Sequence, residues 1–452
     1  MKQGTGNSLF SIPCSLLSVT LTPVIVHALA QSVAILTTVL AVAGMGYFIA
    51  AVLAARIFLA ERRKPLAAFA PSVSVLKSLK GLDPGMMDAF RSHCRQSYAG
   101  EFELLFGVAT KDDPAVAAVL QLQNEFPERT IRLVECPEQL GNNGKVSTLV
   151  QLAAHTRYNF LLINDSDITV SPRYLERVMG CFGATEVSSG AKAPVDSAGI
   201  MRGLKPPPPS ESFISAAGVF PANEVGLVTA LYRGHAHRTL ASQLEALGIA
   251  TDFQAGVLLS KWIEGGLHYG LGSTLAVRRE ALEKIGGLQV LVDYLADDYE
   301  LGARVDGAGY RVALSAEVVE TNIAAYGWRG FIDHQLRWAR TVRDARPWGY
   351  VGLIFTHGLG WALLNVVASG ASLLSFWLLG LSFFLRLALA MTVGAEVLSD
   401  HQVLPNLWLL PLRDIVAMGV WVAGFGGNTI VWRGERFALK DGKLHKTIES
   451  TI

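Results

Sequence analysis

A long apolar stretch near the start of the chain is the first feature of its hydrophobic pattern. Residues 32–60 are almost free of charged side chains, and Arg56 interrupts them only near the end. Because a membrane span needs about 20 apolar residues, we predict a transmembrane helix over 32–60. The basic residues Arg62, Arg63 and Lys64 follow directly. By the positive-inside rule, the chain beyond them is expected to be cytosolic.

A softer apolar stretch, residues 11–30, precedes this span. It ends in Ala28-Leu29-Ala30, a small-x-small pattern typical of a signal-peptide cleavage site. Its charged start is weak, because Lys2 stands alone there. Two interpretations of residues 1–31 stay open: an uncleaved N-terminal tail, or a cleaved signal-like segment.

The apolar excess returns after Pro347, where we predict C-terminal membrane helices within 347–428. Three apolar runs lie in this region, at 351–369, 371–393 and 404–427. The basic residues beyond Trp432 predict a cytosolic tail over 429–452. If both flanks are cytosolic, an even number of crossings must separate them, so one of the three runs should be re-entrant or interfacial.

Three charged residues, Arg386, Arg413 and Asp414, lie within or beside these apolar runs. Charges at membrane depth usually face protein or a water-filled cavity and are candidates for function. The alternative is that Arg386 extends to the interface and that Arg413 pairs with Asp414. The sequence leaves both open.

Between the apolar ends, residues 65–346 alternate short apolar runs with amphipathic stretches. Strands are predicted at 71–76, 103–108, 131–134 and 158–164. The first three are each followed by a predicted helix, at 83–96, 114–126 and 146–155. This alternation predicts an α/β fold with a mostly parallel sheet. In such sheets ligands bind at the carboxyl ends of the strands.

Composition supports a membrane protein with one soluble domain. Of the 452 residues, 51% are hydrophobic and 17% are charged, with a mean hydropathy of +0.34. The net charge of +1 gives no reason to expect a nucleic-acid partner. The four cysteines are scattered without a C-x-x-C pair, so neither a zinc site nor a disulfide framework is expected.

Acidic residues follow two of the predicted strands. Asp112 and Asp113 come after the second strand, where they could contact a nucleobase or ribose or simply cap the next helix. Asp165 and Asp167 end the fourth strand in a D-x-D pattern. Two carboxylates so placed suit Mg²⁺ or Mn²⁺ held together with substrate phosphates. The alternative for the second pair is a polar turn.

Two further groups lie later in the soluble region. Asp297 and Asp298 begin a helical stretch and could supply a general base, although acidic residues also favour helix starts. Arg337, Trp338 and Arg340 lie on a helical stretch before the membrane segments. The arginines could bind a diphosphate, and the stretch could also be an interfacial basic helix.

In this order the motifs resemble membrane glycosyltransferases of the family 2 type. They are most similar to the ceramide glucosyltransferase family, family 21, and within it to bacterial hopanoid-biosynthesis-associated enzymes. The resemblance rests on these segments: 76–84 (LKSLKGLDP), 112–114 (DDP), 165–167 (DSD), 286–288 (GGL), 297–299 (DDY), 337–338 (RW) and 432–437 (WRGERF).

The resemblance implies a GT-A fold, the α/β nucleotide-sugar-binding fold, and an inverting mechanism. It assigns nucleotide contact to Asp113, with Asp112 as a neighbouring candidate, and the metal and diphosphate site to Asp165 and Asp167. It makes Asp298 the catalytic base.

The same resemblance places Arg337 and Trp338 near the donor diphosphate. Lys145 either approaches the nucleotide or is an exposed turn lysine. Two departures from the family pattern are His334, where Gln or Arg is usual, and Asn143-Gly144-Lys145, where asparagine-proline-lysine is usual. The role of His334 is therefore open.

Two segments between the metal site and the base complete the picture. A Pro-rich segment, 205–210, is expected to be a surface insertion. Residues 253–272 are apolar and glycine-rich and are expected to line the acceptor cleft.

The expected activity is transfer of a hexosyl group from UDP-glucose or UDP-N-acetylglucosamine to a lipid hydroxyl, such as that of ceramide or a hopanoid. A divalent cation is the expected cofactor. The chain is expected to be a multi-pass protein of a bacterial inner membrane with a cytosolic catalytic domain. Alternatives are a processive polysaccharide synthase, a polyprenyl-phosphate glycosyltransferase, or a non-enzymatic transporter or receptor. The last would leave the carboxylates unexplained.

Overall fold

The computed structural model describes residues 23–183, 224–325, 327–432 and 435–446. The Pro-rich segment 205–210, Cys14 and most of the N-terminal tail lie outside these residues. The other three cysteines, Cys94, Cys136 and Cys181, are free.

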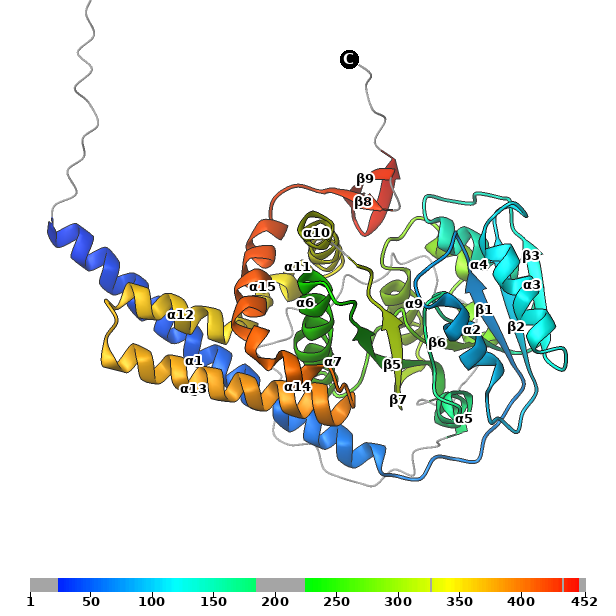
Figure 1. Ribbon diagram of the computed structural model, residues 1–452, viewed down its shortest axis with the longest axis horizontal. Coiled ribbons are helices and arrows are strands. Elements are labelled where there is room, and N and C mark those ends of the chain that lie inside the picture. The colour runs from blue at the N-terminus through cyan, green and yellow to red at the C-terminus, as the bar shows by residue number, and fades with distance from the viewer. Residues whose placement is uncertain (1–22, 184–223, 326, 433–434, 447–452) are drawn as a thin grey trace, which may run out of the picture.

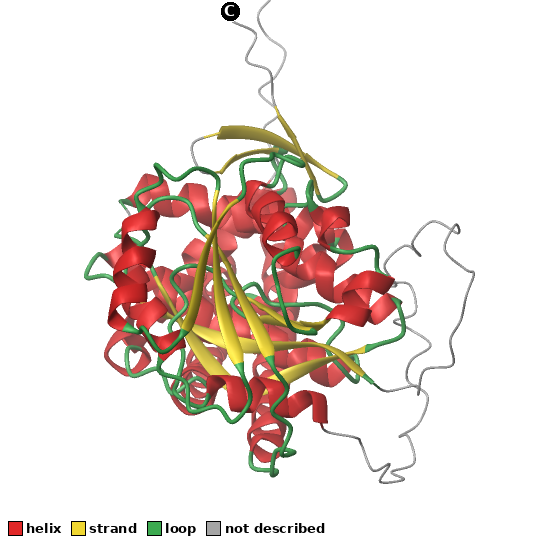
Figure 2. Ribbon diagram, turned by 90° about the vertical axis from the view of Figure 1, so that its right-hand side faces the viewer, coloured by secondary structure: helices red, strands yellow, loops and turns green. Residues whose placement is uncertain are grey.

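A seven-stranded sheet forms the centre of the soluble domain, in the order β3-β2-β1-β4-β6-β5-β7 (Figures 1 and 2). The strands are β1 (Val73–Ser78), β2 (Phe102–Val108), β3 (Thr130–Glu135), β4 (Phe160–Ile163), β5 (Val225–His235), β6 (Leu275–Arg278) and β7 (Arg311–Asn322). Strands β1 to β4 pair in parallel, as do β5 and β7, whereas β6 is antiparallel to both neighbours. The mostly parallel sheet predicted from the sequence is confirmed.

Both faces of the sheet are buried, because successive side chains of a strand point to opposite sides. On β1, Val73 and Val75 pack on one face with α2 (Met86–Cys94), α3 (Ala115–Glu125) and α5 (Tyr174–Gly180). Leu76 packs on the other face. The apolar cluster on that side also contains side chains of α4 (Gly144–Ala153), α7 (Gln254–Ile263) and part of α1 (Pro23–Arg62).

Three of the predicted helices are present, with small differences in their bounds. Helix α2 begins at Met86 rather than at residue 83, because Gly85 has a left-handed backbone with φ of 72°. Helix α4 begins at Gly144, where Asn143 caps it by accepting a hydrogen bond from the Val146 amide. The remaining helices of the soluble domain are α6 (Leu240–Gly248), α8 (Arg279–Lys284), α9 (Asp297–Gly307) and α10 (Trp328–Ala345).

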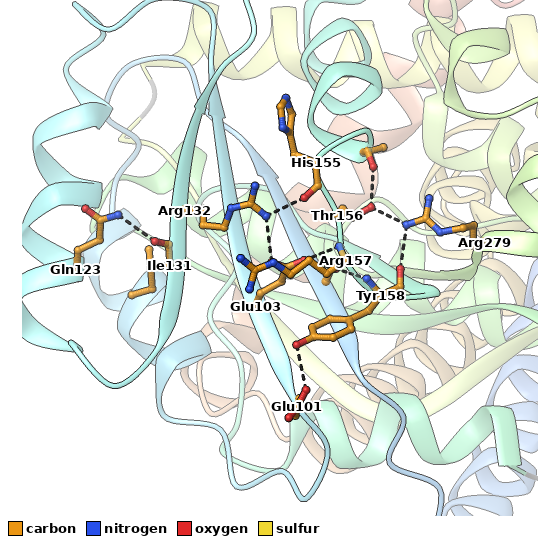
Figure 3. Close-up of polar contacts among 12 residues, drawn as sticks. Glu101, Glu103, Gln123, Ile131, Arg132, His155, Thr156, Arg157, Tyr158 and Arg279 are labelled. Atoms are coloured by element: carbon orange, nitrogen blue, oxygen red, sulfur yellow. Dashed lines mark hydrogen bonds and ion pairs between the residues drawn. The ribbon is translucent and has the colours of Figure 1, made fainter.

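A buried carboxylate at the amino end of the sheet has a structural role (Figure 3). The Glu103 side chain is fully buried and accepts hydrogen bonds from the Ser74 hydroxyl at 2.7 Å and the Arg157 amide at 2.8 Å. Arg132 lies 3.3 Å from its other oxygen and also donates to the His155 carbonyl. These partners compensate the burial of its charge.

Three helices among the described residues are long and apolar enough to cross a membrane, or four if a bent pair counts as one span. They are residues 28–62 of α1, 373–397 and 403–424, and the bent pair joins 347–356 to 358–368 at 60°. The elements involved are α11 (Pro347–Gly352), α12 (Gly358–Ala368), α13 (Leu373–Ala390), α14 (Val403–Asn406) and α15 (Leu410–Gly424).

Helices α12 and α13 lie alongside α1, whereas α15 packs against α10 and α6 and runs across that bundle (Figure 1). The Asn365 side-chain Nδ2 donates to the Ala34 carbonyl at 2.9 Å. Gly44 and Gly358 allow close backbone contact between α1 and α12. Large apolar side chains on the outside of the bundle, such as Leu36 and Trp377, are exposed. An exposed apolar surface of this kind is expected for helices that contact lipid.

The charged residues predicted at membrane depth meet inside the protein. Arg386 is 1% exposed and donates to Asp414 from Nε and Nη2, at 3.0 and 2.9 Å. It also pairs with Asp252 and donates to the Thr251 hydroxyl at 3.0 Å. Arg413 lies 3.2 Å from Asp252. The alternative in which Arg386 extends to the interface is therefore wrong, and Arg413 pairs with Asp252 while Asp414 pairs with Arg386.

Past α15, the segment expected to be a basic tail forms a small antiparallel sheet. Its strands are β8 (Thr429–Trp432), β9 (Glu435–Lys440) and β10 (Lys443–Lys446). Ile430, Phe437, Leu439 and Leu444 pack with Leu295 of the soluble domain. This small sheet is therefore packed onto the loop that precedes Asp297.

Candidate active site

The turn that carries Asp165 and Asp167 follows β4 at the carboxyl edge of the sheet. The Asp165 side chain is 43% exposed, whereas Asp167 is largely buried. The Asp167 carboxylate accepts hydrogen bonds from the Thr321 hydroxyl and, at 3.1 Å, from the Asn322 amide. Burial, followed by the neighbouring Asp165, raises the pKa of Asp167. One carboxylate of the pair is thus fixed against β7 and the other faces outward.

A buried lysine that the sequence analysis did not single out supports this turn. Lys77 is 1% exposed and its Nζ donates to the Asp165 carbonyl at 2.8 Å. Burial lowers the pKa of Lys77 to about 7. The signal was present in the sequence, because Lys77 shares the buried strand face of Val73 and Val75. A lysine at a core position of a strand is rare unless it has a partner.

The loop after β1 also contacts the turn. The Ser166 hydroxyl donates to the Asp83 carboxylate, which lies within the 76–84 motif. Asn164, just before the turn, is buried and donates to the Ser273 carbonyl at 2.6 Å and the Tyr174 hydroxyl at 2.9 Å. These contacts fix the backbone from which Asp165 and Asp167 project.

Lys145 joins the D-x-D turn to the second acidic pair. Its Nζ lies 2.8 Å from Asp165 Oδ1 and 3.5 Å from Asp297 Oδ2. Burial alone would lower the pKa of Lys145, but the Asp165 and Asp297 carboxylates outweigh it, and the pKa is raised. Its interpretation as an exposed turn lysine is therefore wrong, since its side chain is only 15% exposed and lies between two acids.

Asp298 lies beside this cluster at the start of α9. Burial first, and then the charge of Asp297, raise the pKa of Asp298 to about 6. The Tyr299 amide donates to its Oδ1 at 2.8 Å. Gly272 passes so close that a Cβ there would lie 2.8 Å from Asp298 Oδ2. The 253–272 segment therefore reaches the acid pair, and a side chain at Gly272 would displace the Asp298 carboxylate.

Asp113 has the helix-capping role that the sequence left open, together with a second contact. Its Oδ1 accepts a hydrogen bond of 2.9 Å from the Ala115 amide at the start of α3. Both of its carboxylate oxygens also lie within 3.1 Å of the Gly81 amide, in the loop after β1. Asp112 beside it is exposed. Nucleotide contact by Asp112 or Asp113 stays a prediction.

Trp338 packs on an aromatic cluster between the sheet and the membrane helices. Its ring centroid lies 6.2 Å from Phe253 and 5.1 Å from His334. His334 Nδ1 lies 3.1 Å from the buried Glu245 carboxylate. Arg337, one residue before Trp338 on α10, is half-buried. This helix was predicted correctly, while donor contact by Arg337 and Trp338 stays a prediction.

The other arginines of α10 contact the chain that leads into the C-terminal sheet. Arg340 Nη1 donates to the Thr429 carbonyl at 2.6 Å. Arg343 donates to the Gly427 carbonyl at 3.0 Å and also contacts Asn428. Diphosphate binding by Arg340 together with Arg337 stays a prediction, because the contact with Thr429 uses only one nitrogen of the Arg340 guanidinium.

A divalent cation fits this site only if the substrate supplies some of the ligands of the cation. No group of three or more His, Cys, Asp or Glu side chains that could hold a metal occurs within the described part of the chain. Asp165 and Asp167 are hard oxygen donors on one turn, and Asp165 is partly exposed. Mg²⁺ commonly binds through one or two carboxylates and completes its shell with phosphates and water. The donor set fits that mode.

Asp165 and Asp167 thus lie at the carboxyl edge of the sheet and are joined through Lys145 to Asp297, in a chain that also has helices apolar enough to span a membrane. A family model described as glycosyl transferase family 21 matches residues 36–197 and 215–445. The chain belongs to glycosyl transferase family 21. It is therefore a glycosyltransferase, and the resemblance given above is confirmed at the level of the family. The particular closeness to hopanoid-associated enzymes stays a prediction.

Individual relatives are more distant. Ceramide glucosyltransferase 3 of Caenorhabditis elegans is 23% identical over 387 residues, which cover 82% of this chain and 73% of the relative. Ceramide glucosyltransferase 1 of the same organism is 22% identical over 84% of this chain and 74% of its own length. A solved structure of the mannosyltransferase PcManGT from Pyrobaculum calidifontis, in complex with GDP-Man and Mn²⁺, is 17% identical. It covers 88% of this chain and 97% of its own, with a TM-score of 0.46.

Proposed function

We propose that this glycosyltransferase moves one hexosyl group from a nucleotide sugar, UDP-glucose or UDP-N-acetylglucosamine, to the hydroxyl of a membrane lipid such as ceramide or a hopanoid. The observation that carries the proposal is the cluster of Asp165, Lys145, Asp297 and Asp298. It joins an exposed carboxylate suited to a diphosphate-bound cation with a carboxyl suited to act as a base. The relatives named ceramide glucosyltransferase support the lipid acceptor.

In the proposed mechanism, Asp298 takes the proton of the lipid hydroxyl. The hydroxyl oxygen forms a bond to the anomeric carbon as the bond from that carbon to the diphosphate breaks, and the configuration inverts. A pKa of about 6 suits this role, because the carboxylate is ionised at neutral pH yet basic enough to accept a proton. The nucleoside diphosphate leaves with the electron pair of the broken bond.

The donor diphosphate is placed over the D-x-D turn. Asp165 and Asp167 would hold Mg²⁺ or Mn²⁺, which would neutralise charge on the departing diphosphate. Lys145 lies 2.8 Å from Asp165 and adds positive charge on the same side. Arg337 and Trp338 are assigned to the diphosphate, and Asp112 or Asp113 to the nucleoside. Preorganised charges of this kind stabilise charge that develops in a transition state.

Membrane placement is part of the proposal. Helices α1 and α12 run antiparallel, since Gly358 contacts Gly44 and the Asn365 side chain donates a hydrogen bond to Thr37. Helix α13 runs in the same direction as α1, since Arg386 of α13 lies over the Phe48 ring and Glu396, just past α13, pairs with Arg56. Helix α12 would thus cross the membrane away from the catalytic side, and α13 would cross back. Helix α15 would lie at the membrane interface. Two crossings would return the chain to the catalytic side, and the basic residues after α1 support a cytosolic assignment for that side by the positive-inside rule.

The test is the mass of the product made by the full-length chain in lipid nanodiscs. The donors are UDP-glucose and UDP-N-acetylglucosamine, and the acceptors are ceramide, a hopanoid polyol and a polyprenyl phosphate. A ceramide or hopanoid product heavier by one sugar residue is expected. A ladder of polymer masses would show a processive synthase, and a polyprenyl product would show the other transferase type. No transfer from either donor to any acceptor would refute the proposal.

A further inference from the structure

The turn between β3 and α4 contacts two segments that are distant in sequence. The Asn142 amide and its side-chain Nδ2 both donate to Asp293 Oδ1, each at 3.0 Å. The same Nδ2 donates to the Leu444 carbonyl of β10 at 2.9 Å. Asn142 therefore lies at a junction between the loop before the catalytic acids and the C-terminal sheet.

Asn143 makes a second set of contacts at this junction. Its side chain is fully buried, and Oδ1 accepts the Val146 amide at 3.1 Å, which caps α4. Its Nδ2 donates to the Tyr294 carbonyl at 2.7 Å and lies 3.4 Å from Asp297 Oδ1. Its backbone amide donates to the Val292 carbonyl at 2.7 Å. The helix that begins here carries Lys145.

Capping alone does not account for an asparagine at position 143. Ser, Thr or Asp would cap α4 about as well, because capping needs only an acceptor oxygen. The donor half of the amide is used instead on the segment 294–297. An asparagine side chain can do both, because it carries an acceptor oxygen and two N–H donors.

The C-terminal sheet closes the same loop from its other side. The Leu444 amide donates to the Asp293 carbonyl at 2.7 Å, and the Leu295 amide donates to the Gly442 carbonyl at 3.1 Å. The Gly442 amide in turn donates to the Asp344 carboxylate of α10. Leu295 is buried among the apolar side chains of the sheet. The loop 292–296 is thus held between Asn143 and β10.

We propose that Asn143 is a positioning residue for sugar transfer, and that the docked sheet β8–β10 completes its action. Together they fix the acid pair Asp297–Asp298 relative to Lys145. This rests on the proposed function, in which Asp298 is the base. Displacement of a catalytic group by about 1 Å can cost up to about a hundredfold in rate. Loss of the amide donor is therefore expected to lower kcat rather than the affinity for donor.

The decisive variant is Asn143→Ser, which keeps an acceptor for the α4 cap and loses the donor to Tyr294. Its kcat is expected to fall on the order of tenfold, with the donor KM close to that of the wild type and a thermal midpoint above that of Asn143→Ala. Asn143→Ala loses the cap as well, and should lower both kcat and the midpoint. Gln151→Ala is the matched control, because Gln151 also joins α4 to a backbone segment, at Glu138, away from the acids.

Three kinetic results would overturn the proposal. One is a kcat of Asn143→Ser within about twofold of the wild type. Another is a fall in kcat that follows only the thermal midpoint across both variants. The third is an equal loss of kcat in Gln151→Ala. A kcat that is lowered in both Asn143→Ser and Asn143→Ala, with a higher thermal midpoint in Asn143→Ser, supports the positioning role.

Hydrogen exchange of the full chain provides a test that needs no activity. In Asn143→Ser, the Leu295 amide is expected to exchange faster, while the amides of α4 keep their protection. Leu444→Asp, which introduces a charge at a buried position of β10, should give the same change at Leu295 with Asn143 intact. Unchanged exchange at Leu295 in both variants would overturn the proposal. If the wild type transfers no sugar, the proposed function fails, and this measurement still decides whether Asn143 and β10 hold the acid loop.

Discussion

Replacement of Asp298 by asparagine should remove transfer and at the same time stabilise the soluble domain. Both effects follow from the environment of this carboxyl. Burial and the neighbouring Asp297 raise the pKa of Asp298 from 3.8 to about 6. The ionised form, which the reaction needs, is therefore the form that the folded protein disfavours. Asparagine has nearly the same shape, can still accept a hydrogen bond from the Tyr299 amide, and carries no charge.

The size of the stability effect follows from the pKa shift. A shift of about 2 units corresponds to about 3 kcal/mol at 1.36 kcal/mol per unit. Because Asp298 is only partly buried, solvent screening reduces this to about 1–2 kcal/mol. The folded-state pKa is raised, so the carboxyl favours folding fully below its unfolded pKa, near 4. This contribution is lost as the pH rises through about 6. The variant should thus be the more stable protein at pH 7.5, and the difference should shrink toward pH 4.

The assays are thermal unfolding in detergent between pH 4 and 8, followed by tryptophan fluorescence, and transfer measured by product mass. The variant is expected to melt about 2–6 °C higher at pH 7.5. Its transfer rate should fall by at least about 10²–10⁴-fold. Wild-type transfer should itself decline below about pH 6, as Asp298 becomes protonated. Asp88→Asn, at an exposed position of α2, should change neither quantity.

Three outcomes would refute this reasoning. Transfer by Asp298→Asn within tenfold of the wild-type rate would remove Asp298 from the base role. A wild-type rate independent of pH between 5 and 8 would contradict the raised pKa as the source of the pH dependence. A variant that melts at or below the wild-type temperature at pH 7.5 would show that the buried charge does not cost folding free energy.

Three other substitutions test the remaining parts of the site and the membrane bundle. Asp167→Asn should weaken donor binding that depends on Mg²⁺ or Mn²⁺, and an unchanged metal dependence in a donor-binding titration would exclude Asp167 from the cation site. Lys77→Met should raise the Mn²⁺ concentration required for half-maximal transfer several-fold, because the Asp165 carbonyl loses its partner; an unchanged requirement would limit Lys77 to the core. Arg386→Met should cost about 3–5 kcal/mol, seen as early loss of monomer on heating in size-exclusion chromatography, because Asp414 is left charged and buried. Adding Asp414→Leu should recover part of that loss, and no recovery would contradict the pairing.

The parallel half of the sheet could be predicted because its strands carry their own signal. Strands β1, β2 and β4 are short apolar runs that end in acidic or polar turns, as expected when both faces are buried. The strands β5, β6 and β7 were not predicted. They lie beyond residues 184–223, and β6 runs antiparallel to its neighbours. Nothing local distinguishes an antiparallel strand inside a parallel sheet.

The acids of the site could be placed from the sequence for a related reason. In a parallel sheet ligands bind at the carboxyl ends of the strands, so the turns after β2 and β4, which carry Asp113 and Asp165, were the places where acids of the site were expected. What the sequence could not decide was the choice between two roles at one position. Lys145 could equally have been a surface residue of its turn, and only its contact with Asp165 and Asp297 separates the two.

Asn143 shows why the remaining contacts were beyond reach. It lies just before an apolar helical run, where a capping residue is common, and the structure shows that it caps α4. Its contact with Asp297 joins positions 154 residues apart, and the contact of Asn142 with Leu444 joins positions 302 apart. Such contacts leave no periodicity in the sequence. The basic composition of the last 24 residues predicted a basic cytosolic tail, since the charge pattern does not report that Leu439 and Leu444 pack with Leu295. The chemistry of the site could therefore be predicted from local motifs, whereas the contacts that position its acids depend on packing between distant parts of the chain.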